Sequence, residues 1–103
     1  MSEPEAAYVG AMIEAEGSVN VHPTYKGERR YWRIGVVNTD LEIISALLRA
    51  TGIGRVGLDR ILEGRKLIWR WRVTRINDVD ALTKRIAAYS TKAQRVTNDG
   101  LCY

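Results

Sequence analysis

The stretch from residue 8 to residue 19, YVGAMIEAEGSV, constrains the fold more than any other part of the chain. It is largely apolar, and small residues at Gly10, Ala11 and Ala15 would allow a second helix to approach closely. Gly17 suits the left-handed position that commonly ends a helix, and a strand-like run begins immediately after it. The stretch therefore predicts a closely packed helix that stops at residue 17 and passes directly into a strand.

Two glutamates, Glu14 and Glu16, fall in the last turn of this predicted helix. The last backbone carbonyls of a helix lack intrahelical partners, and its C-terminal end carries partial negative charge. A carboxylate is poorly placed there unless a positive charge offsets it, and a divalent cation can do so. The alternative is a buried helix whose two glutamates are simply solvated.

Apolar periodicity predicts two further helices and two pairs of strands. Capping signals open the helices at Ser2, Thr39 and Asn77. Alternating apolar residues indicate the strands, and glycine-containing turns at 23–30 and 63–65 join them into hairpins. The predicted elements are, in order, a helix at 3–17, strands at 18–23 and 31–38, a helix at 40–51, strands at 53–60 and 66–75, and a helix at 78–89.

This order predicts a single α+β domain over residues 1–103, an αββαββα arrangement of two layers with a four-stranded antiparallel sheet. Trp32, Trp69 and Trp71 occupy the same alternating positions as other apolar strand residues. That placement favours packing against the helices over a protein-binding surface built from tryptophans. The intervening arginines are then expected on the open face of the sheet.

Positive charge is concentrated in the middle of the chain. Residues 20–75 hold twelve Lys or Arg against five Asp or Glu, within a net charge of +4 for the whole chain. This excess indicates a polyanionic partner, and in the major groove of double-stranded DNA arginine can bind guanine and asparagine can bind adenine. The predicted DNA-binding residues are Asn20, His22, Arg29, Tyr31, Arg33, Arg55, Asp59, Arg70 and Arg72.

The composition excludes several other kinds of protein. The single cysteine, Cys102, excludes an internal disulfide and a multi-cysteine zinc site, and His22 has no second histidine to share a metal ion. No apolar run approaches the roughly 18 residues that cross a membrane. The acidic first residues lack the features of a signal peptide. We therefore expect an intracellular protein, cytoplasmic or organellar, that makes no use of a membrane.

Residues 9–17, VGAMIEAEG, resemble the nine-residue LAGLIDADG signature of homing endonucleases, and Ser18 follows where serine is frequent in that family. Both acidic residues are Glu instead of Asp, and the Ala-Gly pair is reversed. The predicted αββαββα order is also the order of that family, so the resemblance covers nearly the whole chain. It implies a site-specific endonuclease of double-stranded DNA that depends on Mg²⁺ (or Mn²⁺), leaves 3′ overhangs and serves intron or intein mobility.

The resemblance also implies which residues carry the reaction. Glu16, Asn38 and Lys92 match catalytic positions of the family, and Glu16 together with the carbonyl of Ala15 would bind the metal ion. Glu42 departs from the family's pattern, which often has a basic residue in the opening turn of the second helix. The basic part of the expected site is therefore less complete than in the family.

A chain with one signature would hold half of an active site, so the resemblance implies a homodimer and a near-palindromic target. The implied interface residues on the first helix are Tyr8, Gly10, Ala11, Ile13 and Glu14. The alternative is that the small residues pack within the core of one chain. Glu14 is expected to support the end of the helix instead of acting as a principal metal ligand.

Two other functions stay open for the same fold. Relatives of this type also serve as catalytically silent DNA-binding regulators or as RNA-splicing maturases, and a basic sheet would suit either role. A carboxylate at Glu16 that faces phosphates favours the nuclease, because a protein that only binds nucleic acid has no use for it.

Overall fold

The computed structural model describes residues 1–23 and 30–99. The elements are α1 (Glu3–Glu16), β1 (Gly17–Pro23), β2 (Arg30–Asn38), α2 (Leu41–Thr51), β3 (Arg55–Leu62), η1 (Glu63–Arg65), β4 (Lys66–Val73), α3 (Ile76–Ile86), η2 (Ala87–Tyr89) and α4 (Thr91–Asp99). The predicted α+β order is confirmed, and η1 falls in the turn predicted for the second hairpin. The helix α4 was not predicted.

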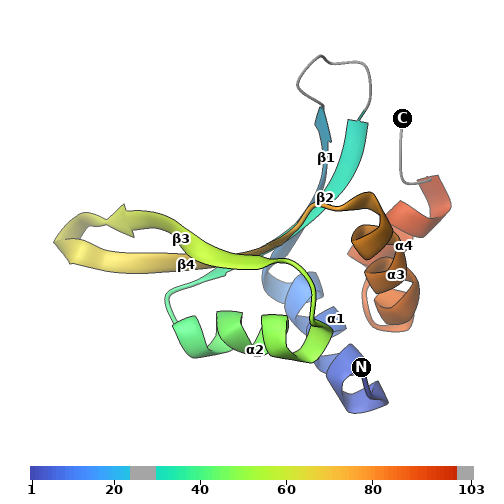
Figure 1. Cartoon of the computed structure of the whole chain (residues 1–103), viewed down its shortest axis with the longest axis horizontal. Helices are drawn as coiled ribbons and strands as arrows, with labels where there is room; N and C mark the ends of the chain where they lie inside the picture. The colour runs from blue at the N-terminus through green and yellow to red at the C-terminus, as the bar shows by residue number, and fades with distance from the viewer. Residues whose placement is uncertain (24–29, 100–103) are drawn as a thin grey trace.

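The four strands form one antiparallel sheet in the order β1-β2-β4-β3, so β1 and β3 are its edges. The helices α1, α2 and α3 pack against one face of the sheet, and the other face is left open (Figure 1). Ile13, Ile34 and Trp71 lie fully buried between the two layers. No helix in the described ranges combines the length and the apolar character needed to cross a membrane.

The helix starts agree with the sequence at α1 and differ at the other two. Ser2 forms the predicted reciprocal capping pair with the residue three positions on. The N-cap of α2 is Asp40 instead of Thr39, because the carboxylate of Asp40 accepts the backbone N–H two residues later. The third helix begins after Arg75, which supplies no capping side chain, so Asn77 lies inside the first turn.

Gly17 ends α1 for a different reason than predicted. Its φ is −82° and its ψ is 163°, which is extended backbone and not the left-handed conformation. The chain passes straight into β1 and folds back over the last turn of α1, where a Cβ on Gly17 would lie 2.8 Å from both the Cα and the carbonyl oxygen of Ile13. Glycine is therefore needed here for a close approach of two backbone segments.

The second hairpin starts at Arg55, two residues later than predicted. Before it, Trp71 donates its indole N–H to the carbonyl of Ile53 at 3.0 Å. Gly54, with φ of +85°, passes so close that a Cβ there would lie 2.7 Å from the indole nitrogen. A tertiary contact with the core tryptophan thus delays the strand.

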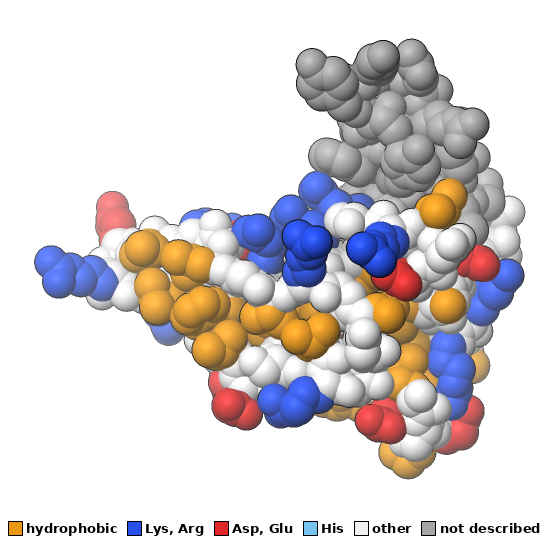
Figure 2. Space-filling view, viewed as in Figure 1, with side chains coloured by type: hydrophobic (Ala, Val, Ile, Leu, Met, Phe, Trp, Pro, Cys, Tyr) orange, Lys and Arg blue, Asp and Glu red, His pale blue; other side chains and the backbone are white. Residues whose placement is uncertain are grey.

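The two faces of the β3–β4 hairpin have opposite character. Leu58, Ile61 and Leu67 are exposed on the face toward α2, where Figure 2 shows hydrophobic side chains gathered beneath a basic upper surface. Trp69 is half-buried on this apolar face, and Trp71 is fully buried in the core. With Trp32 only 6% exposed as well, the predicted core role of the tryptophans is confirmed.

Candidate active site and nucleic-acid interface

The C-terminal end of α1 meets the C-terminal end of β2 at Glu16 and Asn38. The side-chain amide of Asn38 donates to Oε2 of Glu16 at 3.1 Å. The amide oxygen of Asn38 accepts the backbone N–H of Asp40 at 2.8 Å, just before α2 begins. Because both ends of the amide are engaged, Asn38 has one orientation, and it holds the exposed carboxylate of Glu16 in place.

Lys92 reaches the same end of α1 from the first turn of α4. Its ammonium group donates to the carbonyl oxygen of Gly17 at 2.8 Å. This contact is with the backbone of the residue that follows Glu16, and within the described parts of the chain no ion pair joins Lys92 to the carboxylate of Glu16. The three residues with predicted catalytic roles are thus brought together from α1, β2 and α4.

Glu14 points away from this site and caps α4. Its carboxylate accepts the backbone N–H of Lys92 at 3.2 Å, the hydroxyl of Ser90 at 3.4 Å and the hydroxyl of Thr91. These hydrogen bonds, led by the one from Thr91, lower the pKa of Glu14 below the ordinary glutamate value. Glu14 is thus engaged within its own chain, and its expected supporting role at the helix end fits these contacts.

The donor atoms at the end of α1 fit a hard divalent cation in part. Glu16 offers a carboxylate, and the carbonyl of Ala15 lies in the last helical turn, where no further intrahelical N–H follows. Mg²⁺ is commonly held by one or two carboxylates together with substrate phosphate oxygens. Across residues 1–23 and 30–99 no cluster of three or more His, Cys, Asp or Glu is found. A cation held there would therefore need further oxygens besides those of Glu16 and Ala15.

The faces of α1 differ from the predicted interface. Gly10 and Ile13 were expected to contact a second chain, but both are buried in the core of their own chain. Gly10 packs against Tyr89, since a Cβ added to Gly10 would lie 2.5 Å from the Cβ of Tyr89. Tyr8 and Ala11 are exposed, so these two members of the predicted set remain accessible to a second chain.

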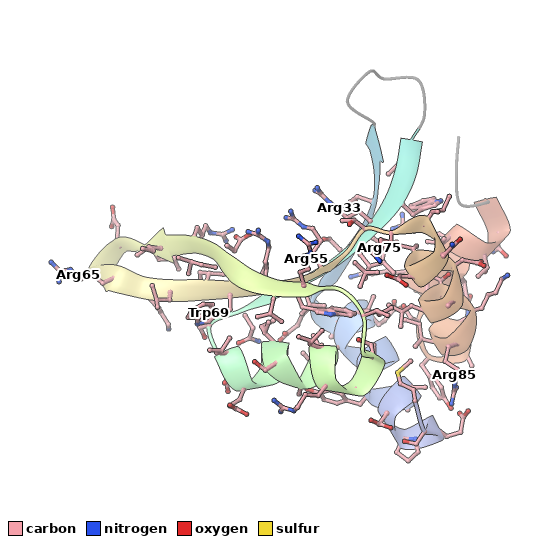
Figure 3. All side chains as sticks on the ribbon, in the orientation of Figure 1. Arg33, Arg55, Arg65, Trp69, Arg75 and Arg85 are labelled. Atoms are coloured by element: carbon pink, nitrogen blue, oxygen red, sulfur yellow. The ribbon has the colours of Figure 1, made fainter. Side chains whose placement is uncertain are left out.

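Basic and amide side chains share the open face of the sheet. Asn20 lies opposite Arg33 in the β1–β2 pair, and Arg55 lies opposite Arg72 in the β3–β4 pair. Arg70 is two residues from Arg72 on the same strand and therefore points to the same face. Figure 3 shows Arg33 and Arg55 on this side of the sheet and Trp69 on the side of α2.

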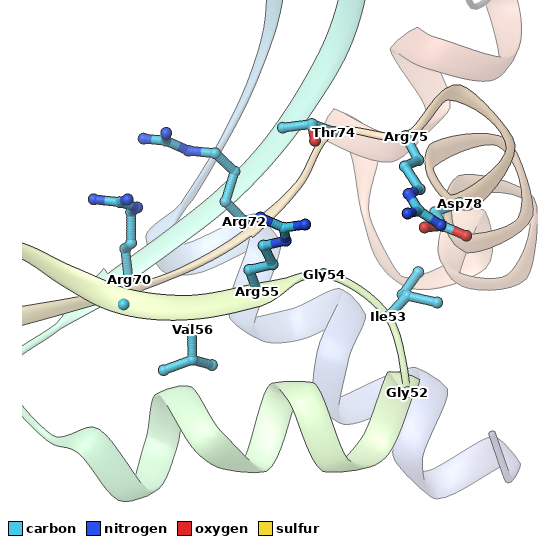
Figure 4. Close-up of a pocket in the computed structure, with 11 residues that line it drawn as sticks. Gly52, Ile53, Gly54, Arg55, Val56, Arg70, Arg72, Thr74, Arg75 and Asp78 are labelled. Carbon is cyan, nitrogen blue, oxygen red and sulfur yellow. The ribbon is translucent and has the colours of Figure 1, made fainter.

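This face has a positively charged hollow of about 740 Å³ beside the start of β3. Arg55, Arg70 and Arg72 line it from the sheet, and Arg75 and Asp78 line it from the start of α3 (Figure 4). Burial lowers the pKa of Arg72, and the neighbouring charges of Arg33 and Arg70 lower it further. The cluster therefore repels itself and is suited to receive an anion or an electronegative group.

Four other predicted DNA-binding residues are placed less directly. The backbones of His22 and Tyr31 pair with each other in β1 and β2. Arg29 lies outside the described residues. Asp59 lies at a β-bulge, where its carboxylate is paired with Arg60 at 2.9 Å instead of standing free.

Arg95 of α4 and Arg75 of the turn before α3 were missed by the sequence prediction. Arg95 donates to the carbonyl of Val19 at 3.1 Å, and Lys92 donates to Gly17, so α4 covers the outer edge of β1. Arg75 lines the basic hollow from the turn before α3. The basic residues spaced three apart at 92 and 95 are the sequence signal that could have identified a basic helical face.

Comparison with protein-family models and with curated proteins gives no match. Solved structures do match. The archaeal intron-encoded homing endonuclease I-Vdi141I, complexed with DNA, has a TM-score of 0.65 and 23% identity over 84% of this chain. The homing endonuclease I-CvuI in complex with its target has a TM-score of 0.69 and 14% identity over 92% of this chain. The group I intron-encoded homing endonuclease I-CeuI, complexed with DNA, has a TM-score of 0.68 and 14% identity over 94% of this chain.

This chain has the LAGLIDADG endonuclease fold, as the sequence resemblance implied. It spans 56% of the I-Vdi141I chain, 64% of the I-CvuI chain and 52% of the I-CeuI chain. The similarity at these identities concerns the fold.

Proposed function

We propose that this protein is a site-specific endonuclease of double-stranded DNA that acts as a homodimer with a divalent cation, Mg²⁺ (or Mn²⁺). It would cut a near-palindromic site to leave 3′ overhangs and could thereby serve intron or intein mobility. The observation that carries the proposal is the convergence of Glu16, Asn38 and Lys92, from three different elements, beside an arginine-rich sheet face.

Each of these side chains has a distinct task in the proposed reaction. Glu16 and the carbonyl of Ala15 would hold the cation, and Asn38 keeps the carboxylate of Glu16 in one orientation. The cation, when bound, would make an attacking water more acidic and stabilise the leaving 3′ oxygen. Lys92 would place positive charge next to the phosphate as negative charge develops in the transition state.

The open sheet face supports DNA as the substrate. Its arginines lie on strands, and a two-stranded β-ribbon can enter the major groove. The carboxylate of Glu16 is at the end of α1, where the chain turns into β1 of that same sheet. A duplex lying on the arginines would therefore run close to the catalytic groups.

The outer face of α1 supports a homodimer. The inner face of the helix is covered by its own chain, whereas Tyr8 is 41% exposed and Ala11 and Ala15 are exposed beside it. These three positions follow the spacing of one helical face, and the small alanines permit a close crossing of two helices. A two-fold crossing there would bring the Glu16 carboxylates of both chains together and so supply further oxygen ligands for the cation.

Cleavage of a randomised double-stranded DNA library, with Mg²⁺ and with EDTA, tests the proposal. We expect metal-dependent staggered cuts with 3′ overhangs at a near-palindromic sequence. Glu16→Gln should abolish cutting while changing DNA affinity less than about tenfold, because it removes a metal-binding charge and leaves the arginine face intact. Glu42→Gln is the matched control, since Glu42 is an exposed glutamate on α2 and is paired only with Arg49 at 3.7 Å among the described residues.

Other outcomes would redirect the assignment. Cutting by Glu16→Gln at the wild-type rate would remove the proposed metal site. Selection of a bound but uncut sequence would indicate a DNA-binding regulator. Binding of RNA without binding of DNA would indicate a splicing role.

A further inference from the structure

A β-bulge interrupts the outer strand of the arginine-bearing hairpin. Leu58 pairs with Trp69 and Arg60 pairs with Ile68, so Asp59 is the extra residue with no cross-strand partner. Bulges are common beside functional sites because they re-aim a side chain. On the open face, Arg70 lies opposite Gly57, just before the bulge along β3.

Arg70 is held by the strand opposite it. Its Nη1 donates to the carbonyl oxygen of Leu58 at 3.0 Å and lies 3.9 Å from Oδ1 of Asp59. The other carboxylate oxygen of Asp59 is occupied by Arg60 at 2.9 Å. The position of Gly57 lies next to this guanidinium, since a Cβ there would be in ordinary van der Waals contact with Nη2 of Arg70, at 3.9 Å.

The contacts of Arg70 distinguish it from three other arginines of this face. Among the residues whose side chains the structure describes, none forms a hydrogen bond or ion pair with the guanidinium of Arg33, Arg55 or Arg72. Arg70 has therefore lost side-chain freedom before any ligand arrives, whereas the other three retain more of it. A side chain ordered in advance loses less entropy on binding and presents its donors in a fixed direction.

The charge around Arg70 also narrows what it can bind. Asp59 offsets part of its positive charge and would repel a phosphate placed against it. The edge of a guanine carries two acceptors and no net charge, and arginine binds it with two parallel hydrogen bonds. A fixed, partly neutralised guanidinium thus suits a base edge better than the DNA backbone.

We infer that Arg70 reads a guanine and that Asp59 is a positioning residue that aims it without touching DNA. Arg33, Arg55 and Arg72 then supply adaptable contacts to the phosphates. This inference rests on the proposed function, because it needs a specific DNA target. It also changes the role of Asp59 from the DNA contact expected from the sequence to a support for its neighbour.

Base-substituted versions of the selected target test the reading role. Arg70→Lys should lose about 5- to 150-fold of the preference for guanine at one symmetric pair of positions. Asp59→Asn should weaken discrimination at those same positions while binding to random DNA stays equal or increases, because a negative charge is removed. Arg60→Ala, the control, also loses contact with Asp59 but should leave the base preference unchanged.

A second variant and a DNA-free measurement keep the test decisive. Gly57→Thr leaves Asp59 intact but fills the space under Arg70, so it should reduce the same base preference. In the free protein, ¹⁵N relaxation of the arginine side chains should show Nε of Arg70 to be more ordered than Nε of Arg55. Asp59→Asn should abolish that difference.

The results separate this inference from the proposed function. One outcome is that the protein selects a specific target while Asp59→Asn and Gly57→Thr leave its base preference unchanged. That result would refute the inference and leave the proposed function standing. An equal loss of affinity on every sequence with Arg70→Lys would assign Arg70 to phosphate and also refute it. An ordered Arg70 in a protein that selects no DNA would refute the proposed function, and the reading role with it.

Discussion

Gly10 gives a direct test of which face of α1 belongs to the core. In Gly10→Ala the new methyl group would lie 2.5 Å from the Cβ of Tyr89 and 3.5 Å from the carbonyl oxygen of Ile86. Carbon atoms in good contact are about 3.5–4.0 Å apart, so α1 and η2 must separate by roughly 1 Å. Overpacking of this kind costs about 1–3 kcal/mol, and the better helix propensity of alanine returns about 0.5–1 kcal/mol.

The net expectation is a loss of about 0–2.5 kcal/mol in the free energy of unfolding. Denaturant unfolding at several protein concentrations would measure it and separate unfolding from dissociation. For the proposed homodimer, sedimentation equilibrium should show the same dissociation constant in Gly10→Ala as in the wild type. Ala11→Glu is the counterpart on the exposed face, and it should weaken the dimer while leaving the stability of the monomer nearly unaffected. A weaker dimer with unchanged monomer stability in Gly10→Ala would refute the assignment of Gly10 to the core.

Three further changes probe the site. Lys92→Met should lower the single-turnover cleavage rate about 10²-fold or more with little change in DNA affinity, because it removes charge that acts on the transition state. Glu14→Gln should make the free energy of unfolding less dependent on pH in the acid range. The folded-state pKa of Glu14 is lowered, so the carboxylate contributes its full stabilisation above the ordinary glutamate value of 4.5 and loses it as the pH falls through the folded-state pKa. Equal acid sensitivity of wild type and Glu14→Gln would contradict the cap. Arg72→Met should raise the melting temperature of the free protein at low salt, because it relieves repulsion by Arg33 and Arg70. It should also weaken DNA binding, because a positive charge is lost. A rise in melting temperature that persists in high salt would indicate an effect of packing instead of charge.

The parts of the fold set by local patterns could be predicted from the sequence. The capping box at Ser2 and the glycine in the turn at 63–65 act through neighbouring residues, and both are found where expected. The α4 helix could not be predicted in this way. Its apolar contribution to the core is limited to Ala93 and Val96. Ser90 does supply a local N-cap, since its hydroxyl accepts the backbone N–H of Ala93 at 3.2 Å, but the N–H of Lys92 is accepted by Glu14, which lies 78 residues earlier in the sequence.

The inward packing of Gly10 and Ile13 and the bulge at Asp59 were not predicted from the sequence. A helix that is apolar on nearly every side does not reveal which face turns inward, so Gly10 and Ile13 were expected at an interface and are found in the core. The bulge at Asp59 does leave a trace in the sequence. Apolar residues alternate at Val56 and Leu58 and then reappear at Ile61, three positions on, which indicates a change of side in the strand. The contacts of Arg70 with Leu58 and Asp59 join two strands, so they could not be predicted from the pattern of one strand.

The spacing of the two acidic residues explains how one helix end organises the whole site. Successive residues of an α-helix are about 100° apart, so residues two positions apart point in nearly opposite directions. Glu14 accordingly faces α4 and accepts the N–H of Lys92, while Glu16 faces β2 and accepts from Asn38. The first carboxylate thereby fixes the helix that carries the ammonium group, and the second is held in one orientation by Asn38. Because the ammonium group of Lys92 binds the carbonyl of Gly17, the contacts of both glutamates are found at the end of α1. An acidic residue at either position alone would hold half of this arrangement, which is why the Glu-Ala-Glu-Gly sequence is so informative about what the chain does.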